Sequence, residues 1–223
     1  MKIKRFLLSK TVAKLIIMPL LRLHSFAYKY SGVYSVILNE GSHPKHGIIR
    51  YFDWFNNNIN KQDVVVDIGC NKGYMVNYLS NKAKYVYGIE IISEFIEYAN
   101  DNYLGNNIMF INEDATKFNF KSLNHNISIV TLSNVLEHID NRVDFLKKIK
   151  SNIQSNIKFL IRVPMINREW IVIYKKNMGL EYRLDKTHFI EYTIEKFKDE
   201  IEEAGLKILN HEIKWGEIYA ICE

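Results

Sequence analysis

Hydrophobic and polar positions follow two alternating patterns from residue 61 to the C-terminus. Short apolar runs rich in β-branched residues, such as DVVVDIG at 63–69, are typical of strands buried on both faces of a parallel sheet. The segments between them carry apolar residues at helical spacing, with Ser93 and Thr193 as expected N-caps and Gly205 as an expected helix end. We therefore expect strands at 63–69, 85–91, 108–115, 127–139 (running into a loop), 157–165, 207–214 and 217–223, and helices at 73–83, 93–104, 143–153 and 193–206.

This alternation predicts an α/β fold. We expect a Rossmann-like, seven-stranded and mostly parallel sheet with helices on both faces and one antiparallel strand near the C-terminus. Ligands of such sheets bind at the carboxyl ends of the strands, beside the point where the strand order reverses. The expected domains are a basic helical arm and cap at 1–60 and the sheet domain at 61–223, with an insertion at about 165–192.

The segment before Lys61 has a different pattern. Its beginning, MKIKRFLLSKTVAKLIIMPLLRLHSF, does not fit an export signal, because Lys14 interrupts the apolar segment, Pro19 and Arg22 close it, and no cleavage pattern follows. It is also too short and too charged to span a membrane. A second, short amphipathic helix is expected before the Asn run at 56–58. Its apolar residues are Ile48, Ile49, Phe52, Trp54 and Phe55.

Apolar residues of the arm fall near one helical face, which leaves two interpretations. The arm packs on the domain body, or it rests on an anionic membrane surface. The residues of this face are Phe6, Leu7, Ala13, Ile16, Ile17, Leu20 and Leu21.

Charge is distributed unevenly between the arm and the rest of the chain. The formal net charge is +5, and all of the excess comes from the segment before Glu40, which contains no Asp or Glu. From Glu40 onward acidic residues slightly outnumber basic ones, so the body lacks the basic surplus typical of nucleic-acid-binding domains. The arm's basic residues are Lys2, Lys4, Arg5, Lys10, Lys14, Arg22 and Lys29.

Composition changes this picture little. Hydrophobic residues make up 48% of the chain and charged residues 25%, which are the proportions of a globular protein. Cys70 and Cys222 are far apart and form no metal-binding or disulfide spacing, so we expect a reducing, cytoplasmic environment.

A loop with two glycines follows the first expected strand. Gly69 and Gly73 allow a sharp turn and a close approach of a ligand to the backbone, and Asp67 would repel a diphosphate. A dinucleotide site needs G-x-G-x-x-G, whereas the sequence reads G-C-N-K-G. The segment resembles motif I, D-x-G-C-G-x-G, of the class I S-adenosylmethionine-dependent methyltransferases. Cys70 also matches, and Asn71 stands at the central glycine, where Asn tolerates a left-handed backbone better than most residues.

Three further segments extend this resemblance in order and spacing. It implies that Glu90, which lies next to Ile91 and follows Asp67 at the family's spacing, holds the ribose hydroxyls of S-adenosyl-L-methionine. It further implies contacts of Asp114 and Ala115 with the adenine. The segment LSNVLEHI resembles the family's L-x-x-V-L-E-H, which implies that Ser133 and Asn134 flank the methionine moiety and that Glu137 and His138 face the methyl-transfer cleft.

Methyl transfer requires alignment of the acceptor with the methyl group and, for a hydroxyl acceptor, removal of a proton. His138 is the expected catalytic base by type, with a structural role in the loop as the alternative. Metal-dependent members of the family carry E-x-x-E-H, and this chain has Asn134 at the first position, so no metal is expected. Asp185, His188 and Glu191 are the residues that could replace the missing ligand.

The expected insertion is dense in Arg, Tyr, Trp and His, which favours a role in the acceptor pocket. Arg168, Tyr182 and His188 are the expected acceptor contacts. HPKHGIIRYF more weakly resembles methyltransferases of surface-glycan and small-molecule pathways, which implies that His43, Lys45 and His46 cap the pocket.

We therefore predict an S-adenosylmethionine-dependent O-methyltransferase acting on a small molecule or glycan, with the arm against the inner face of the membrane as an open alternative. An RNA ribose methyltransferase and a non-catalytic S-adenosylmethionine-binding partner protein are the competing hypotheses. The acidic surplus beyond the arm argues against RNA.

Overall fold

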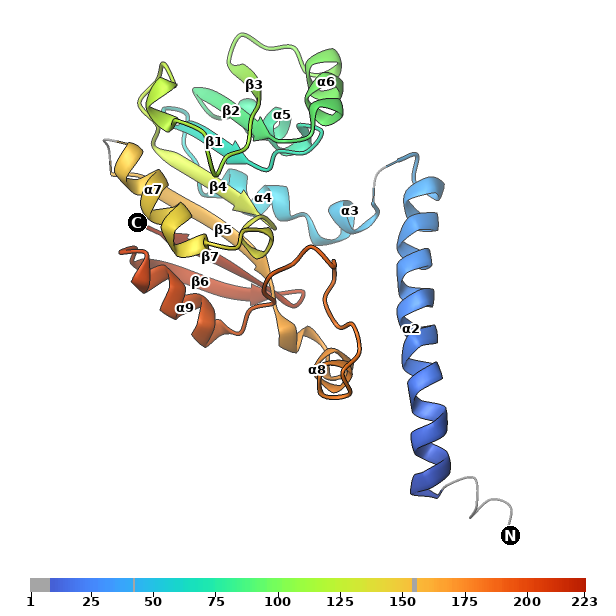
Figure 1. Cartoon of the computed structure of the whole chain (residues 1–223). Helices are drawn as coiled ribbons and strands as arrows, with labels where there is room; N and C mark the ends of the chain where they lie inside the picture. The colour runs from blue at the N-terminus through green and yellow to red at the C-terminus, as the bar shows by residue number, and fades with distance from the viewer. Residues whose placement is uncertain (1–8, 42, 154–155) are drawn as a thin grey trace. The chain divides into compact units, whose positions relative to one another are not determined.

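The computed structural model describes residues 9–41, 43–153 and 156–223 (Figure 1). The chain divides into two compact units, Met1–Arg50 and Tyr51–Glu223. The second unit contains a seven-stranded sheet in the order β3-β2-β1-β4-β5-β7-β6. The strands are β1 Val64–Ile68, β2 Tyr85–Glu90, β3 Ile108–Asn112, β4 Ile129–Ser133, β5 Lys158–Pro164, β6 Ile208–Lys214 and β7 Glu217–Cys222. The predicted Rossmann-like fold is confirmed.

Strand directions follow from the connections. β1 pairs in parallel with β2 and β4, and the outer pairs β2–β3 and β4–β5 are parallel as well. A tight turn joins β6 to β7, so these two strands are antiparallel. β7 also runs antiparallel to β5. The chain order reverses between β1 and β4, so the loops after these strands meet at the switch point of the sheet.

Helices cover both faces of this sheet (Figure 1). The helices α4 Tyr51–Asn57, α5 Tyr74–Ser80 and α6 Ser93–Asn102 lie on one side, with α5 and α6 against β2 and β3. The other side carries α7 Arg142–Asn152, α9 Ile194–Glu203 and the 3-10 turn η1 Phe120–Ser122. The remaining elements are η2 Leu136–His138 after β4, and η3 Ile166–Arg168 and α8 Trp170–Asn177 within the expected insertion.

Helix ends test the capping predictions. The hydroxyl of Thr193 accepts a hydrogen bond from the Lys196 N–H, and Gly205 beyond the helix has a φ of 71°, so both predicted ends of α9 are confirmed. The prediction for Ser93 is wrong, because the N-cap of α6 is Ile92 and Ser93 is already helical. The turn begins early because the Glu90 carboxylate accepts hydrogen bonds from the two N–H groups that precede Ser93.

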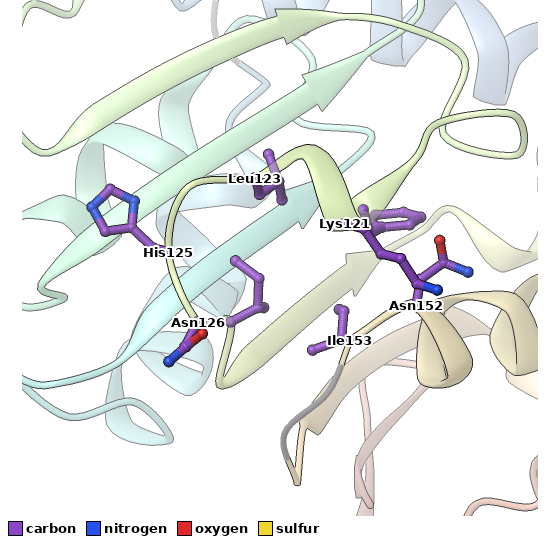
Figure 2. A pocket seen from close by; sticks show the side chains of 8 residues that line it. Lys121, Leu123, His125, Asn126, Asn152 and Ile153 are labelled. Atoms are coloured by element: carbon purple, nitrogen blue, oxygen red, sulfur yellow. The ribbon is translucent and has the colours of Figure 1, made fainter.

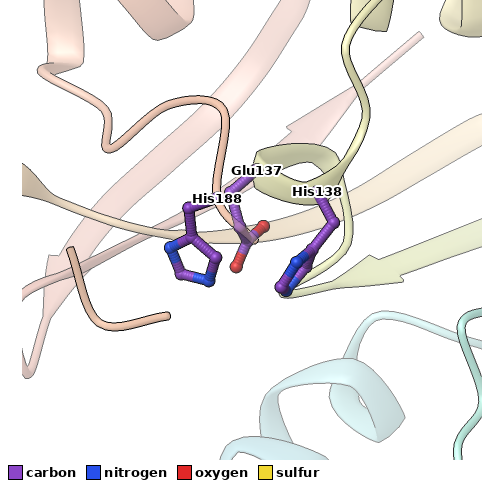
Figure 3. A group of neighbouring side chains, drawn as sticks. All are labelled: Glu137, His138 and His188. Atoms are coloured by element: carbon purple, nitrogen blue, oxygen red, sulfur yellow. The ribbon is translucent and has the colours of Figure 1, made fainter. Parts of the chain in front are cut away.

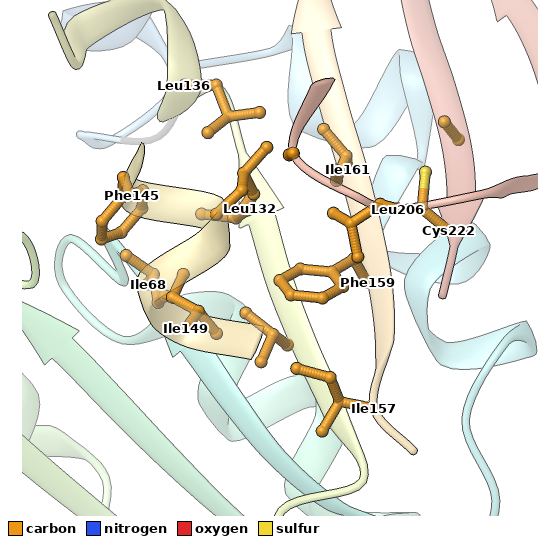
Figure 4. Packing of buried hydrophobic residues seen from close by; sticks show 14 of the residues in the cluster. Ile68, Leu132, Leu136, Phe145, Ile149, Ile157, Phe159, Ile161, Leu206 and Cys222 are labelled. Atoms are coloured by element: carbon orange, nitrogen blue, oxygen red, sulfur yellow. The ribbon is translucent and has the colours of Figure 1, made fainter. Parts of the chain in front are cut away.

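The core lies between the sheet and the α7–α9 layer (Figure 4). Side chains from β1, β4 and β5 interlock there with those of α7. Because helices also cover the opposite face, these strands are apolar on both faces. Phe145 and Ile149 of α7 meet Leu132 and Phe159 of the sheet. This packing holds the carboxyl ends of β1 and β4 in fixed positions.

The Met1–Arg50 unit contains α2 Lys10–Leu38 and α3 Lys45–Ile49 in its described part. The helix α2 continues through Pro19 and Arg22, the two residues expected to close the apolar segment. The single short helix expected before the Asn run is two helices, α3 and α4, because Arg50 between them has a left-handed backbone with a φ of 51°. Phe6 and Leu7 lie outside the described residues. Among the helices that are described, none has the length and apolarity needed to cross a membrane.

Candidate active site at the carboxyl ends of the strands

Every second residue from Gly69 to Gly73, in the loop after β1, has a left-handed backbone. Gly69, Asn71 and Gly73 have φ values of 69°, 50° and 80°. A Cβ on Gly69 would lie 2.7 Å from Cγ2 of Val135, so the loop packs too closely on the β4 loop for any other residue. Asn71 shows that the central position needs a left-handed backbone but no glycine, as its residue type suggests.

Glu90, at the end of β2, fixes this loop. Its Oε2 accepts a hydrogen bond of 3.0 Å from the Asn71 N–H, and its Oε1 accepts bonds of 2.9 and 3.1 Å from the N–H groups of Ile91 and Ile92. The side chain is buried, so it is not an exposed glutamate at a helix start. A carboxylate has about four acceptor sites, which leaves one to take a hydroxyl of a ligand.

Asp67, the last acidic group before the loop, is fully buried. Its Oδ1 accepts a hydrogen bond of 2.6 Å from the Thr131 hydroxyl, whereas Oδ2 has no partner among the described residues. Burial raises the pKa of Asp67 to about 7, the Thr131 hydrogen bond opposes this shift, and the charge of Glu90 adds to it. A cation close to Oδ2 would restore the ionised form.

The turn after β3 carries a third acidic group of this edge, after Glu90 and Asp67. Asp114 follows shortly after Asn112, which pairs with Glu90 across β2 and β3. The Asp114 carboxylate accepts hydrogen bonds from the N–H and the hydroxyl of Thr116 at 3.0 and 2.7 Å, and these lower its pKa. Ala115 beside it is partly buried.

The loop after β4 begins with Ser133 and Asn134. Asn134 has a φ of 56°, and its buried Oδ1 lacks a hydrogen-bond partner in the described part of the chain. The Ser133 hydroxyl accepts a hydrogen bond of 3.0 Å from Nη1 of Arg162. Asn134 therefore presents an unused acceptor next to the glycine loop.

Arg162 is a site residue that sequence analysis missed. It is buried, donates to both carboxylate oxygens of Glu217 at 2.6 and 2.7 Å, and lies 3.9 Å over the Tyr51 ring. Glu217 also accepts a hydrogen bond of 3.4 Å from the side-chain amide of Asn134, so the Arg162–Glu217 ion pair is linked to the loop after β4. The signal was a pair of opposite charges in two apolar strands: Arg162 inside IKFLIRVPM and Glu217 at the start of EIYAICE.

Glu137, His138 and His188 form a cluster that we call the Glu-His-His cluster (Figure 3). One ligand atom from each lies within 4.8 Å of the others, and the two imidazole rings meet edge to face with 4.5 Å between their centroids. Glu137 is fully buried without a partner for either oxygen among the described residues, and burial raises its pKa to about 8. The acid is therefore neutral at pH 7.

His138 is the exposed member of this cluster. Burial of part of its ring, with a smaller effect of His188, lowers its pKa, so the imidazole is neutral at pH 7. Its Nδ1 lies 2.9 Å from the Thr187 hydroxyl, which donates its proton to Asp185 at 2.8 Å. Because a hydroxyl has one proton, Nδ1 of His138 must be the donor to Thr187, and Nε2 keeps a free lone pair.

The cluster offers the donor atoms of a metal site. Of the three residues suggested as replacement ligands, one lies in the cluster and two are hydrogen-bonded elsewhere. His188 joins the cluster. Asp185 accepts from the N–H and the hydroxyl of Thr187, and Glu191 accepts from Leu184 at 2.5 Å and from Arg168. A carboxylate and two imidazoles suit a divalent ion, and a bound ion would displace the proton of Glu137.

The other residues predicted to contact the substrate are Arg168, Tyr182, His43 and His46. Arg168 donates hydrogen bonds to the Glu191 carboxylate and to the carbonyls of Met165 and Tyr182, the last two at 2.8 and 3.2 Å. It therefore connects three parts of the insertion. Tyr182 is partly buried. His43 and His46 belong to the Met1–Arg50 unit, in which His43 Nδ1 accepts from the Lys45 N–H at 3.1 Å.

A cavity of about 370 Å³ lies elsewhere (Figure 2). Its lining includes Lys121, His125 and Asn126, which precede β4, and Asn152 at the end of α7. The residues described above follow the opposite ends of the strands, so this cavity is separate from the candidate site.

Comparisons with known proteins agree with this architecture. The sequence model of a family described as "Methyltransferase domain" matches residues 42–211. A probable ribosomal RNA small subunit methyltransferase A of Pyrococcus abyssi is 36% identical over 70 residues, which are 31% of this chain and 26% of that protein. The chain thus spans about a quarter of the length of this curated relative.

Solved structures share the fold at low sequence identity. The DhpI–SAM–HEP complex has a TM-score of 0.62 at 14% identity and covers 88% of this chain and 95% of that one. Small RNA methyltransferase HEN1 has a TM-score of 0.63 at 17% identity, over 78% of this chain and 25% of that one.

The sheet order, the glycine loop and the family match define a class of protein. The chain belongs to the methyltransferase-domain family, within the class I S-adenosylmethionine-dependent methyltransferases. Its cofactor is accordingly S-adenosyl-L-methionine, a ligand with a sulfonium and an ammonium charge. The buried, unsatisfied acceptors of Asp67 and Asn134 fit such a cation, because each lacks a donor among the described residues.

Proposed function

We propose that this chain transfers the methyl group of S-adenosylmethionine to a hydroxyl oxygen of a small molecule or glycan. The observation that carries the proposal is the chain of hydrogen bonds from His138 through Thr187 to Asp185, which leaves a neutral imidazole with a free Nε2. That arrangement suits removal of a proton from a hydroxyl. The free thiols of Cys70 and Cys222 are compatible with a reducing, cytoplasmic compartment.

The cofactor would lie over the loop after β1. We assign the ribose hydroxyls to Glu90 with Ile91, the adenine to Asp114 and Ala115, and the methionine moiety to Ser133 and Asn134. The backbone of the loop residues would line the same ligand. These residues are Asp67, Gly69, Cys70, Asn71 and Gly73, and their support is the convergence of acceptor groups that a cationic ligand needs.

When bound, S-adenosylmethionine supplies an electrophilic methyl group on a sulfonium. His138 would accept the acceptor's proton at Nε2, while its Nδ1–H stays bonded to Thr187. Asp185, whose pKa is lowered by the N–H and hydroxyl of Thr187, stays ionised and stabilises the imidazolium that forms. Glu137 and His188 would shape the cleft behind His138, and Arg168 and Tyr182 would hold the insertion that borders the acceptor.

A labelled-methyl assay tests this proposal. The full chain is incubated with methyl-labelled S-adenosylmethionine and fractions of cell extract, and label is expected in small molecules or glycans. His138→Ala should reduce the rate by about 10²- to 10⁴-fold while leaving S-adenosylhomocysteine binding unchanged. Label in RNA would favour the RNA methyltransferase hypothesis. Cofactor binding without transfer to any fraction would favour a non-catalytic partner protein.

A further inference from the structure

The helix α2 has two chemically distinct sides. At about 100° per residue, its basic residues project within one arc of about 120°, and a continuous apolar side covers most of the remainder. This side extends along the whole helix. Ile16 and Leu20 of the face expected from the arm sequence lie on it, whereas Leu21 projects within the basic arc and is buried. Its exposed members are Leu15, Ile16, Leu20, Leu23, Phe26, Tyr30, Val33, Tyr34, Ile37 and Leu38. The basic residues are Lys10, Lys14, Arg22 and Lys29.

Nothing in the described part of the Met1–Arg50 unit is large enough to cover this side. The 29 residues of α2 extend over about 44 Å, whereas α3 has 5 residues. Water-exposed apolar residues that form a continuous patch of this length mark an interaction surface.

The charge of the helix identifies the kind of partner. The segment before Glu40 contains no acidic side chain, so each ionised carboxylate or phosphate of a partner meets only attraction. Arg22 and Lys29 project at one margin of the apolar side, where long basic side chains reach the headgroups of a bilayer while the apolar residues enter its surface. Aromatic residues on the same side, such as Phe26 and Tyr30, suit the boundary between headgroups and acyl chains.

We propose that α2 binds in the plane of an anionic lipid bilayer, with its apolar side embedded and its basic residues on the lipid headgroups. The helix would lie on the membrane and not cross it, in agreement with the absence of a spanning segment among the described helices. This proposal is independent of the methyl acceptor. Its consequence is that the Tyr51–Glu223 unit works next to a membrane surface.

Vesicle flotation of the full chain tests the proposal. Wild type should float with vesicles of phosphatidylcholine containing about 30% phosphatidylglycerol and stay at the bottom with phosphatidylcholine alone. Replacing Arg22 and Lys29 by Gln should lower the partition coefficient about five-fold for each charge removed. The double variant Leu15→Ser, Leu23→Ser should lower it by about two orders of magnitude, because two side chains no longer leave water.

A matched control uses two exposed leucines of the other unit. Leu104→Ser with Leu209→Ser removes equal side chains outside α2 and should leave flotation unchanged. Thermal melting and S-adenosylhomocysteine binding check that each variant is folded.

Three results would overturn the proposal. The first is wild type that fails to float with anionic vesicles, as for a helix packed on the body. The second is equal flotation with both vesicle types. The third is a concentration-dependent dimer in ultracentrifugation that Leu15→Ser, Leu23→Ser disperses while flotation persists, which would assign the apolar side to a second copy.

Discussion

Substitution of Thr187 is the sharpest test of the proposed base. In wild type the single hydroxyl proton of Thr187 is donated to Asp185 over 2.8 Å, which forces Nδ1 of His138 to donate over 2.9 Å and leaves Nε2 unprotonated. Thr187→Val keeps the shape and removes the hydroxyl. The imidazole then loses both its fixed tautomer and its orientation.

The magnitude follows from one hydrogen bond. A net hydrogen bond contributes about 0.5–1.5 kcal/mol, and the lower half of that range applies because Thr187 and His138 are exposed to water. We expect Thr187→Val to reduce kcat about two- to five-fold. Loss of the whole base in His138→Ala should cost far more, about 10²- to 10⁴-fold.

A pH profile of kcat with labelled S-adenosylmethionine separates this role from simple stability. The charge of Asp185 raises the pKa of His138, so Asp185→Asn should lower it and shift the acidic limb of the profile to lower pH. Thr187→Ser keeps the hydroxyl and is the matched control, with an expected kcat close to wild type. The reasoning is refuted if Thr187→Val retains full kcat, or if Thr187→Ser loses as much as Thr187→Val.

Other predictions concern the buried acids and the loop after β1. Because the pKa of Glu137 is raised from 4.5 to about 8 by folding, wild type should lose stability as pH rises between these values, and Glu137→Gln should melt at a temperature that varies less over that range. Asp67, with a pKa of about 7, should bind S-adenosylmethionine more tightly as pH rises through 7, and calorimetry of Asp67→Asn should show a flatter pH dependence. Asn71→Gly should preserve stability in urea unfolding, whereas Asn71→Ala should cost about 1–2 kcal/mol for its left-handed backbone. Dialysis against a chelator should leave the labelled-methyl activity unchanged, because Asn134 stands where metal-dependent members of the family carry a carboxylate ligand; loss of activity restored by Mn²⁺ would contradict this.

Much of the fold could be predicted because its signals are local. The buried strands are continuous apolar runs, and the glycine loop is marked by residues with special backbone freedom, so β1 and the loop through Gly73 were located from sequence alone. Glu90 was located by its spacing from Asp67. Helix α2 was not predicted in full, because the expected amphipathic face reached only to Leu21, whereas the helix continues to Leu38.

The rest could not be predicted because it depends on contacts between distant parts of the chain. Arg162 and Glu217 are 55 residues apart, and the antiparallel pairing of β5 with β7 brings them together. His138 and Thr187 are 49 residues apart, and a hydrogen bond from the Phe189 N–H to the Glu137 carbonyl at 2.7 Å holds the insertion beside the β4 loop. Register and loop docking decide such pairs, and neither leaves a periodic signal in the sequence.

The two buried acids connect these contacts with the proposed chemistry. Asp67 and Glu137 each have oxygen atoms without a donor among the described residues, and burial raises both pKa values toward or above neutrality. A buried carboxyl in this condition destabilises the fold at neutral pH, so it is retained where a ligand later compensates for it. For Asp67 that ligand would be the cationic cofactor. For Glu137 it would be the imidazolium formed when His138, its neighbour in the Glu-His-His cluster, accepts a proton.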